Sequence, residues 1–161
     1  MMKNIKYKIP RLKTVNIELR DLDYYLDKKF DSKKLDFEFD FMISYENSNN
    51  IEIFIHIQYA YLEKKTKKEE TFFPVYHSDH IVNFELIKSA KNQKTFDVDY
   101  LAHLLGTAII MIKGYYDNIT RGYRINKHPL PVFNPTELIN LKYEDLIKQN
   151  ILTFSSKRKM T

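Results

Sequence analysis

Two runs in which every second residue is apolar, at 35–46 and 51–62, constrain the fold of this chain more than any other feature. Side chains of a β-strand point to opposite faces with a period of two, so each run gives a strand one apolar face. A polar break, Asn-Ser-Asn-Asn at 47–50, separates the runs where a hairpin loop belongs. The apolar members are Leu35, Phe37, Phe39, Phe41, Ile43 and Tyr45, then Ile51, Ile53, Ile55, Ile57, Tyr59 and Tyr61. The spacing predicts a hairpin with a broad aromatic and aliphatic face.

Two more strands are predicted on either side of this hairpin. One covers residues 12–19, and the other covers 71–87 after a charged hairpin end at 63–70. Proline donates no ladder hydrogen bond, so Pro74 weakens the last strand. Residues 78–80 (Ser-Asp-His) predict a bend within it.

The apolar period changes to that of a helix between Asp97 and Arg121. At about 100° per residue, the apolar side chains span an arc of roughly 180°, and only Ile110 breaks the pattern. This arc is wider than the stripe of an ordinary surface helix, so we expect the sheet to cover one flank and a second copy of the chain to cover the other. Gly122 follows where a C-cap glycine belongs. The predicted interface between copies consists of Leu101, Leu105, Ile109, Ile112 and Tyr116.

A second helix is predicted to begin at Asn134-Pro135-Thr136-Glu137, which places Asn at the N-cap, Pro at the first position and Glu three residues after the cap. It is expected to end near Asn150. Strands followed by helices predict an α+β fold: a four-stranded antiparallel sheet, then a long helix and a C-terminal helix. We expect a single domain over residues 1–154 and a flexible basic tail over 155–161.

Composition narrows the classes of function. The 161 residues include no cysteine and three glycines, which excludes disulfides, thiolate metal sites and glycine-rich phosphate loops. No apolar run approaches the roughly 18 residues that span a bilayer, so we expect no membrane insertion and a cytoplasmic location. The net charge of +5 permits anionic partners without demanding them. No nucleophile–base pair stands out, and we predict no catalytic residue, no cofactor and no metal.

Three segments resemble the SecB family of export chaperones. Residues 101–106 (Leu-Ala-His-Leu-Leu-Gly) are similar to the opening of that family's long helix, and residues 120–123 (Thr-Arg-Gly-Tyr) to its end. Residues 131–138 (Pro-Val-Phe-Asn-Pro-Thr-Glu-Leu) resemble the proline-rich run into its last helix. The resemblance covers residues 5 to 150, and the predicted order of strands and helices agrees with it.

The resemblance implies a non-enzymatic, ATP-independent holdase that needs no cofactor. Members of the family bind unfolded polypeptides in apolar grooves between the second strand and the last helix, and they assemble as dimers of dimers. We therefore expect a homo-oligomer, either a dimer or a tetramer. Carried over by element and side-chain face, the client-binding residues are Phe37, Phe39, Phe41, Ile43, Leu138, Ile139 and Leu141.

The chain departs from the export members of that family in its charge. Those members carry acidic residues on the outer sheet face that dock a translocation motor, whereas Thr14 stands at one such position and Glu18 fills another. The net charge and the C-terminal tail are both positive. We interpret the chain as a divergent SecB-like protein whose partner is a translocation motor or a toxin–antitoxin pair.

Ordinary structural explanations compete with these functional ones. The stripe of phenylalanines at 37–41 can be core. Asp36, Glu38 and Asp40, which alternate with them, can be either the solvated face of a strand or a motor-docking or catalytic stripe. His77 and His80 face opposite sides of an extended strand, so a metal site there needs a bend. The lysines at 64–68 predict a solvated hairpin tip or a phosphate-contacting patch. The alternative function is a nucleic-acid-binding or small-ligand-binding α+β module.

Overall fold

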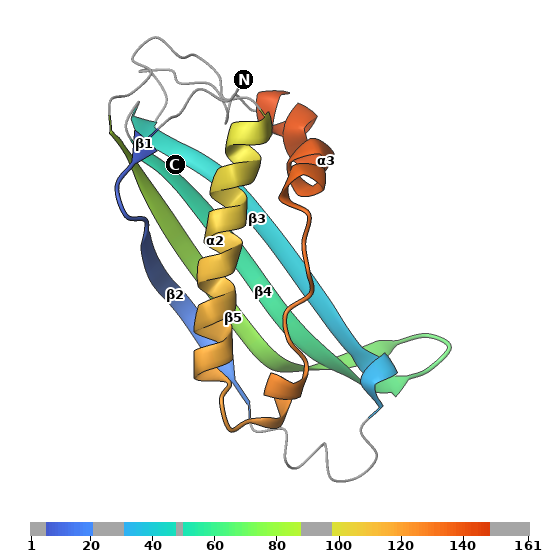
Figure 1. Cartoon of the computed structure of the whole chain (residues 1–161). Helices are drawn as coiled ribbons and strands as arrows, with labels where there is room; N and C mark the ends of the chain where they lie inside the picture. The colour runs from blue at the N-terminus through green and yellow to red at the C-terminus, as the bar shows by residue number, and fades with distance from the viewer. Residues whose placement is uncertain (1–5, 21–30, 48–49, 88–97, 149–161) are drawn as a thin grey trace.

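The computed structural model describes residues 6–20, 31–47, 50–87 and 98–148. Within these ranges five strands form one antiparallel sheet, and the long helix α2 crosses one face of the sheet with the shorter α3 beside it (Figure 1). The predicted α+β class is confirmed, as is the order of a long helix and then a shorter one. The predicted end of the last helix near Asn150 and the basic tail lie outside the described residues.

The elements follow one another in the order strands and then helices. They are β1 (Lys6–Tyr7), β2 (Arg11–Leu19), β3 (Leu35–Asn47), β4 (Asn50–Lys65), β5 (Glu70–Ile87), α2 (Val98–Ile119) and α3 (Pro135–Lys148), with the 3-10 turns η1 (Ser32–Lys34) and η2 (Arg124–Lys127). β5 has β4 on one side and β1 and β2, one after the other, on its other side; β3 pairs with the far side of β4. The prediction of four strands missed β1, because two residues are too few to show an alternation.

The predicted hairpin is formed by β3 and β4. Phe37 lies opposite Tyr59 and Ile43 opposite Ile53, so the apolar members of both runs share one face of the sheet. Asn47 pairs with Asn50, so the strands extend further into the polar break than the sequence indicated. Residues 48–49 lie outside the described part of the chain.

The bend predicted at residues 78–80 is wrong. Ile57, His56 and Ile55 of β4 lie opposite Ser78, Asp79 and His80, and β2 pairs with the same stretch from the other side. A strand with ladder partners on both edges stays extended even where its side chains are of turn-forming type. The irregularity falls instead beside Pro74, where the register with β4 shifts by one residue, in keeping with the preference of proline for bulges.

The core lies between the sheet and α2. The isoleucines of β4 at positions 51, 53, 55 and 57 are at most 1% exposed, and they form one buried cluster with Leu101, Leu104, Leu105 and Ile112 of α2. Each strand turns alternate residues toward this layer, as the period of two predicts. The opposite face of the sheet carries the polar members of the same runs.

Capping residues delimit both helices as the sequence predicts. Gly122, just after α2, has a φ of +88°, which L side chains rarely adopt. The Asn134 side-chain oxygen accepts hydrogen bonds from the backbone N–H groups of Thr136 (3.1 Å) and Glu137 (3.4 Å). These bonds satisfy two donors that the first turn of α3 would otherwise leave unpaired.

Two tyrosine hydroxyls fasten the connection between the helices to the core. Tyr116 on α2 donates hydrogen bonds to the carbonyls of His128 (2.8 Å) and Ile125 (3.1 Å), and Tyr59 on β4 donates to that of Pro129 (2.8 Å). Burial raises the pKa of Tyr59 to about 12, so its hydroxyl stays protonated and able to donate. The connection therefore has a fixed course.

Replacement of Ile55 by alanine is expected to lower the free energy of unfolding by about 2–5 kcal/mol, because it leaves a cavity in a fully buried layer. The matched variant Ile9→Ala removes the same atoms from an almost fully exposed site between β1 and β2 and should change stability by about 0.5 kcal/mol or less. Urea unfolding of both variants measures the difference. Equal losses would contradict the core assignment.

Candidate functional site

A group of half-buried aromatic rings lies along β3, on the sheet face that α2 covers. The ring of Phe133, in the segment before α3, lies 4.4 Å from that of Phe39 and 5.8 Å from that of Phe37, measured between ring centroids. Figure 1 shows this segment running beside β3 toward α3. Contacts at 4.5–7 Å are typical of favourable aromatic pairs. Phe133 thus partly covers the stripe without burying it.

Lys142 holds α3 at the edge of β3. Its ammonium pairs with the Asp40 carboxylate, donates a hydrogen bond to the carbonyl of Phe41 (2.9 Å) and lies 4.5 Å from the centroid of the Phe41 ring. Partial burial acts to raise the pKa of Asp40, but the hydrogen bonds from Lys142 and from the Phe41 N–H, together with the Lys142 charge, hold it below its usual value. Residues 133–142 therefore follow β3 from Phe37 to Phe41.

The residues predicted to bind clients do not share one environment. Phe41, Ile43 and Ile139 are buried in the core of the chain, whereas Phe37, Phe39 and Leu138 are half-buried. Leu141 is 80% exposed. Successive helical positions point in different directions, so Ile139 enters the core while Leu141 faces solvent. The accessible predicted residues are Phe37, Phe39, Leu138 and Leu141; together with Phe133, which was not predicted, we call them the β3–α3 surface.

Sequence reasoning missed Phe133 and the exposed residue beside it, Val132, which is 92% exposed. Both lie in an extended proline-rich segment that is neither helix nor strand, so no ladder or helical period assigns a face to them. It also missed Lys142, since a helix register does not show which strand edge a long side chain reaches. The alternation of β3 did predict two of the aromatic residues of this surface, Phe37 and Phe39.

The predicted interface on α2 is largely occupied by the chain itself. Leu101, Leu105, Ile112 and Tyr116 are buried against the sheet and the inter-helix connection, and Ile109 is half-buried. The apolar arc is wide because both the sheet and the connection cover it, the latter through Ile125 and Leu130. The most exposed apolar side chain on α2 is Ile110, at 72%.

The two histidines of the 77–80 segment point to opposite faces, as the strand period predicts. His80 is buried between sheet and α2: its Nδ1 lies 3.1 Å from the Thr14 hydroxyl and its Nε2 lies 2.9 Å from the Ser78 hydroxyl. Burial lowers the pKa of His80 to about 4. His77, on the other face, lies 3.1 Å from the Asp79 carboxylate.

Asp79 is the charged centre of that other face. Partial burial acts to raise the pKa of Asp79, but hydrogen bonds and charge from His56 and His77 outweigh this and lower it overall. The carboxylate is therefore ionised at neutral pH. The remaining acidic residues predicted as a solvated face, Asp36 and Glu38, are exposed.

Comparison with models of known protein families gives no match, and comparison with curated proteins gives none either. In the described part of the chain, neither helix has the length and apolarity needed to cross a membrane.

Stability is expected to fall as the pH is lowered from about 6.5 toward 4, with His80 contributing. The unfolded imidazole titrates near 6.5 and the buried one near 4, so between these values the unfolded state binds more protons. The contribution is complete above pH 6.5 and is lost as the pH falls, at up to about 1.4 kcal/mol per pH unit. Urea unfolding at about pH 7 and pH 5 measures the loss.

The variant His80→Gln keeps polar atoms near Ser78 and Thr14 but removes the titrating group. Its loss of stability between the two pH values should be smaller than that of the natural chain, because the two proteins differ only in the group at position 80. An equal loss in both proteins would show that His80 does not contribute.

Proposed function

We propose that this chain is a SecB-like, ATP-independent holdase that binds unfolded or aggregation-prone polypeptides at the β3–α3 surface. The observation that carries the proposal is the set of accessible apolar side chains there: Phe37 and Phe39 in ring contact with Phe133, and, on α3, half-buried Leu138 and exposed Leu141. The antiparallel sheet, long helix and capped C-terminal helix agree with what the resemblance to that family implies. The proposal includes no catalysis and places the protein in the cytoplasm.

The chemistry of the surface suits clients of varied sequence. Transfer of apolar area from water gains about 25 cal/mol per Å², whatever the order of residues in the client. Aromatic rings accept several packing geometries, and shallow subsites of this kind favour breadth over selectivity. An exposed apolar surface on a folded chain commonly marks an interaction site.

The surface also has a firm support. Ile139 is buried in the core, and Pro135 packs so closely on α2 that a Cβ at Gly106 would lie 3.2 Å from its ring. Lys142 adds a charged contact at the β3 edge. A client therefore meets a surface that is already formed, which limits the ordering cost of binding.

Self-association belongs to the same proposal and uses the outward face of α2. Ile110 is exposed there, and at Gly114, one turn further on, a Cβ would meet nothing within 4 Å. A second copy can approach the helix backbone closely at such a position. We propose a dimer or a tetramer, and as further partner a translocation motor or the proteins of a toxin–antitoxin pair, which a pull-down of native complexes would distinguish.

Leu141→Asp is expected to weaken capture of a denatured test protein by about 10–100-fold, because burial of a leucine is worth about 1.5–3 kcal/mol and 1.4 kcal/mol corresponds to a factor of ten. The assay follows aggregation of the denatured protein by light scattering, without ATP, at several concentrations of the chain. Leu141 is largely exposed, so the fold should be retained.

Ile9→Asp is the matched control. It introduces the same charge at another almost fully exposed apolar residue, between β1 and β2, and should leave holding unchanged. If Leu141→Asp holds the test protein as well as the natural chain does, the β3–α3 surface is not the client site.

Ile110→Lys is expected to shift the natural oligomer toward monomer, because it places a charge in the proposed contact between α2 helices. Size-exclusion chromatography with light scattering at micromolar concentration gives the mass, and Ile9→Lys serves as the control. A natural chain that is strictly monomeric under these conditions would refute the oligomer.

A further inference from the structure

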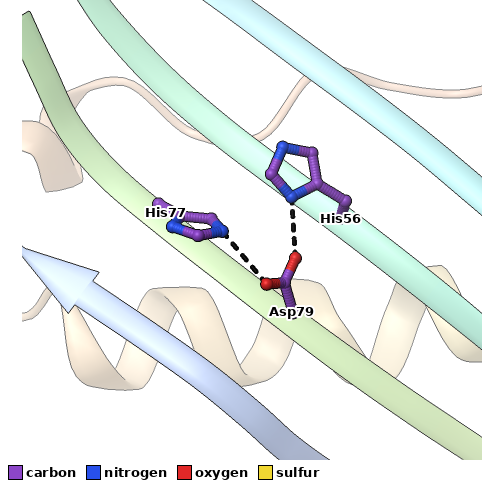
Figure 2. A group of neighbouring side chains, drawn as sticks. All are labelled: His56, His77 and Asp79. Atoms are coloured by element: carbon purple, nitrogen blue, oxygen red, sulfur yellow. Dashed lines mark hydrogen bonds and ion pairs between the residues drawn. The ribbon is translucent and has the colours of Figure 1, made fainter.

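A compact cluster of His56, His77 and Asp79 lies on the sheet face turned away from α2. The Asp79 carboxylate lies between the two rings, with His56 Nδ1 2.7 Å from one oxygen and His77 Nε2 3.1 Å from the other. Figure 2 shows both rings directed at the carboxylate, His56 from β4 and the other two residues from β5. One candidate ligand atom from each residue lies within 4.8 Å of those of the other two.

The strand ladder makes this arrangement a fixed one. His77 and Asp79 are two residues apart on β5 and so share a face, and His56 lies directly opposite Asp79 on β4. β4 and β5 are interior strands along this stretch, with β3 and β2 outside them. The three side chains therefore start from backbone positions that cannot drift apart.

The cluster is neither buried nor fully solvated. The side chains of His56, His77 and Asp79 are 23%, 22% and 18% exposed. An ion can enter from solvent, while most of each side chain rests against neighbours. The ring centroids of His56 and His77 are 5.0 Å apart, so both rings are close enough to contact one ion together with the Asp79 carboxylate.

We propose that His56, His77 and Asp79 bind one divalent transition-metal ion of the zinc class. Two imidazole nitrogens and one carboxylate oxygen form a donor set that zinc commonly uses, with bonds of about 2.0–2.2 Å. Tetrahedral bonds of that length place donor atoms roughly 3.3 Å apart. The donor atoms here are 2.7 and 3.1 Å apart in the two hydrogen bonds and within 4.8 Å of one another overall, so only small shifts of the side chains are needed. The ion replaces the protons that the rings now share with the carboxylate.

The fourth position of this site faces solvent. Two nearby carboxylates are already engaged by cations: Glu18, opposite His77 on β2, lies 2.6 Å from Arg20, and Asp40, opposite His56 on β3, pairs with Lys142. A water molecule, or a nitrogen or oxygen donor from another molecule, therefore completes the coordination. This site is independent of the proposed holdase function, since the β3–α3 surface is on the other face of the sheet.

The test is stoichiometric metal binding by the intact, chelator-treated chain. We expect one Zn²⁺ per chain by mass spectrometry after gel filtration, a rise in melting temperature on Zn²⁺ addition, and visible absorption of a four- or five-coordinate complex with Co²⁺. The variants His56→Gln and Asp79→Asn should each weaken Zn²⁺ binding by about 10–100-fold or more, since even loss of an outer-shell partner costs that much.

The control variant is His103→Gln, which removes an exposed histidine from α2 on the other side of the sheet and should bind Zn²⁺ like the natural chain. NMR of the histidine rings in the natural chain provides a readout that needs no variant to fold: Zn²⁺ should shift the ring signals of His56 and His77 and leave those of buried His80 nearly unchanged. Sub-stoichiometric binding, or equal binding by His56→Gln and the natural chain, overturns the site and leaves a hydrogen-bonded triad that joins β4 to β5.

Discussion

The burial of the β4 isoleucines beneath α2 is the constraint on which the rest of this structure depends. Because β4 lies inside the sheet and its side chains alternate, every second residue enters a layer that excludes water, while the residues between them must face outward. Burial of this row holds α2 in place. The position of α2 in turn determines where Tyr116 lies and thus where the chain runs after the helix.

The course of that connection creates the proposed client surface. Hydrogen bonds from Tyr59 and Tyr116 hold the connection against the core, so that the segment leading to α3 runs beside β3. Phe133 then covers the aromatic stripe only in part, and the first turns of α3 divide their apolar residues between core and solvent. The side chains of this surface remain accessible because α3 is short and packs at β3, the edge strand of the sheet.

Much of the fold was predictable because its signals are local. The alternation in β3 and β4, the cap at Asn134 and the left-handed glycine at 122 each arise from neighbouring residues and are confirmed. The bend predicted at 78–80 is wrong because polar side chains in an interior strand find partners across the sheet. Whether each predicted client-binding side chain is buried or exposed could not be predicted from the sequence, because strand alternation does not distinguish an open groove from a filled one.

The pair His56 and Asp79 shows how far a sequence can reach. Lys65 of β4 lies opposite Glu70 of β5, and a regular antiparallel ladder from that pair would place His56, nine residues earlier, opposite Asp79, nine residues later. The two residues are opposite each other in the structure because the two register shifts between these points cancel. The sequence alone determined which side chains share a face, through the periods of strand and helix. Only the tertiary structure decided which faces are covered and which rings meet, because packing between distant segments depends on register, bulges and the course of connections that no local period encodes.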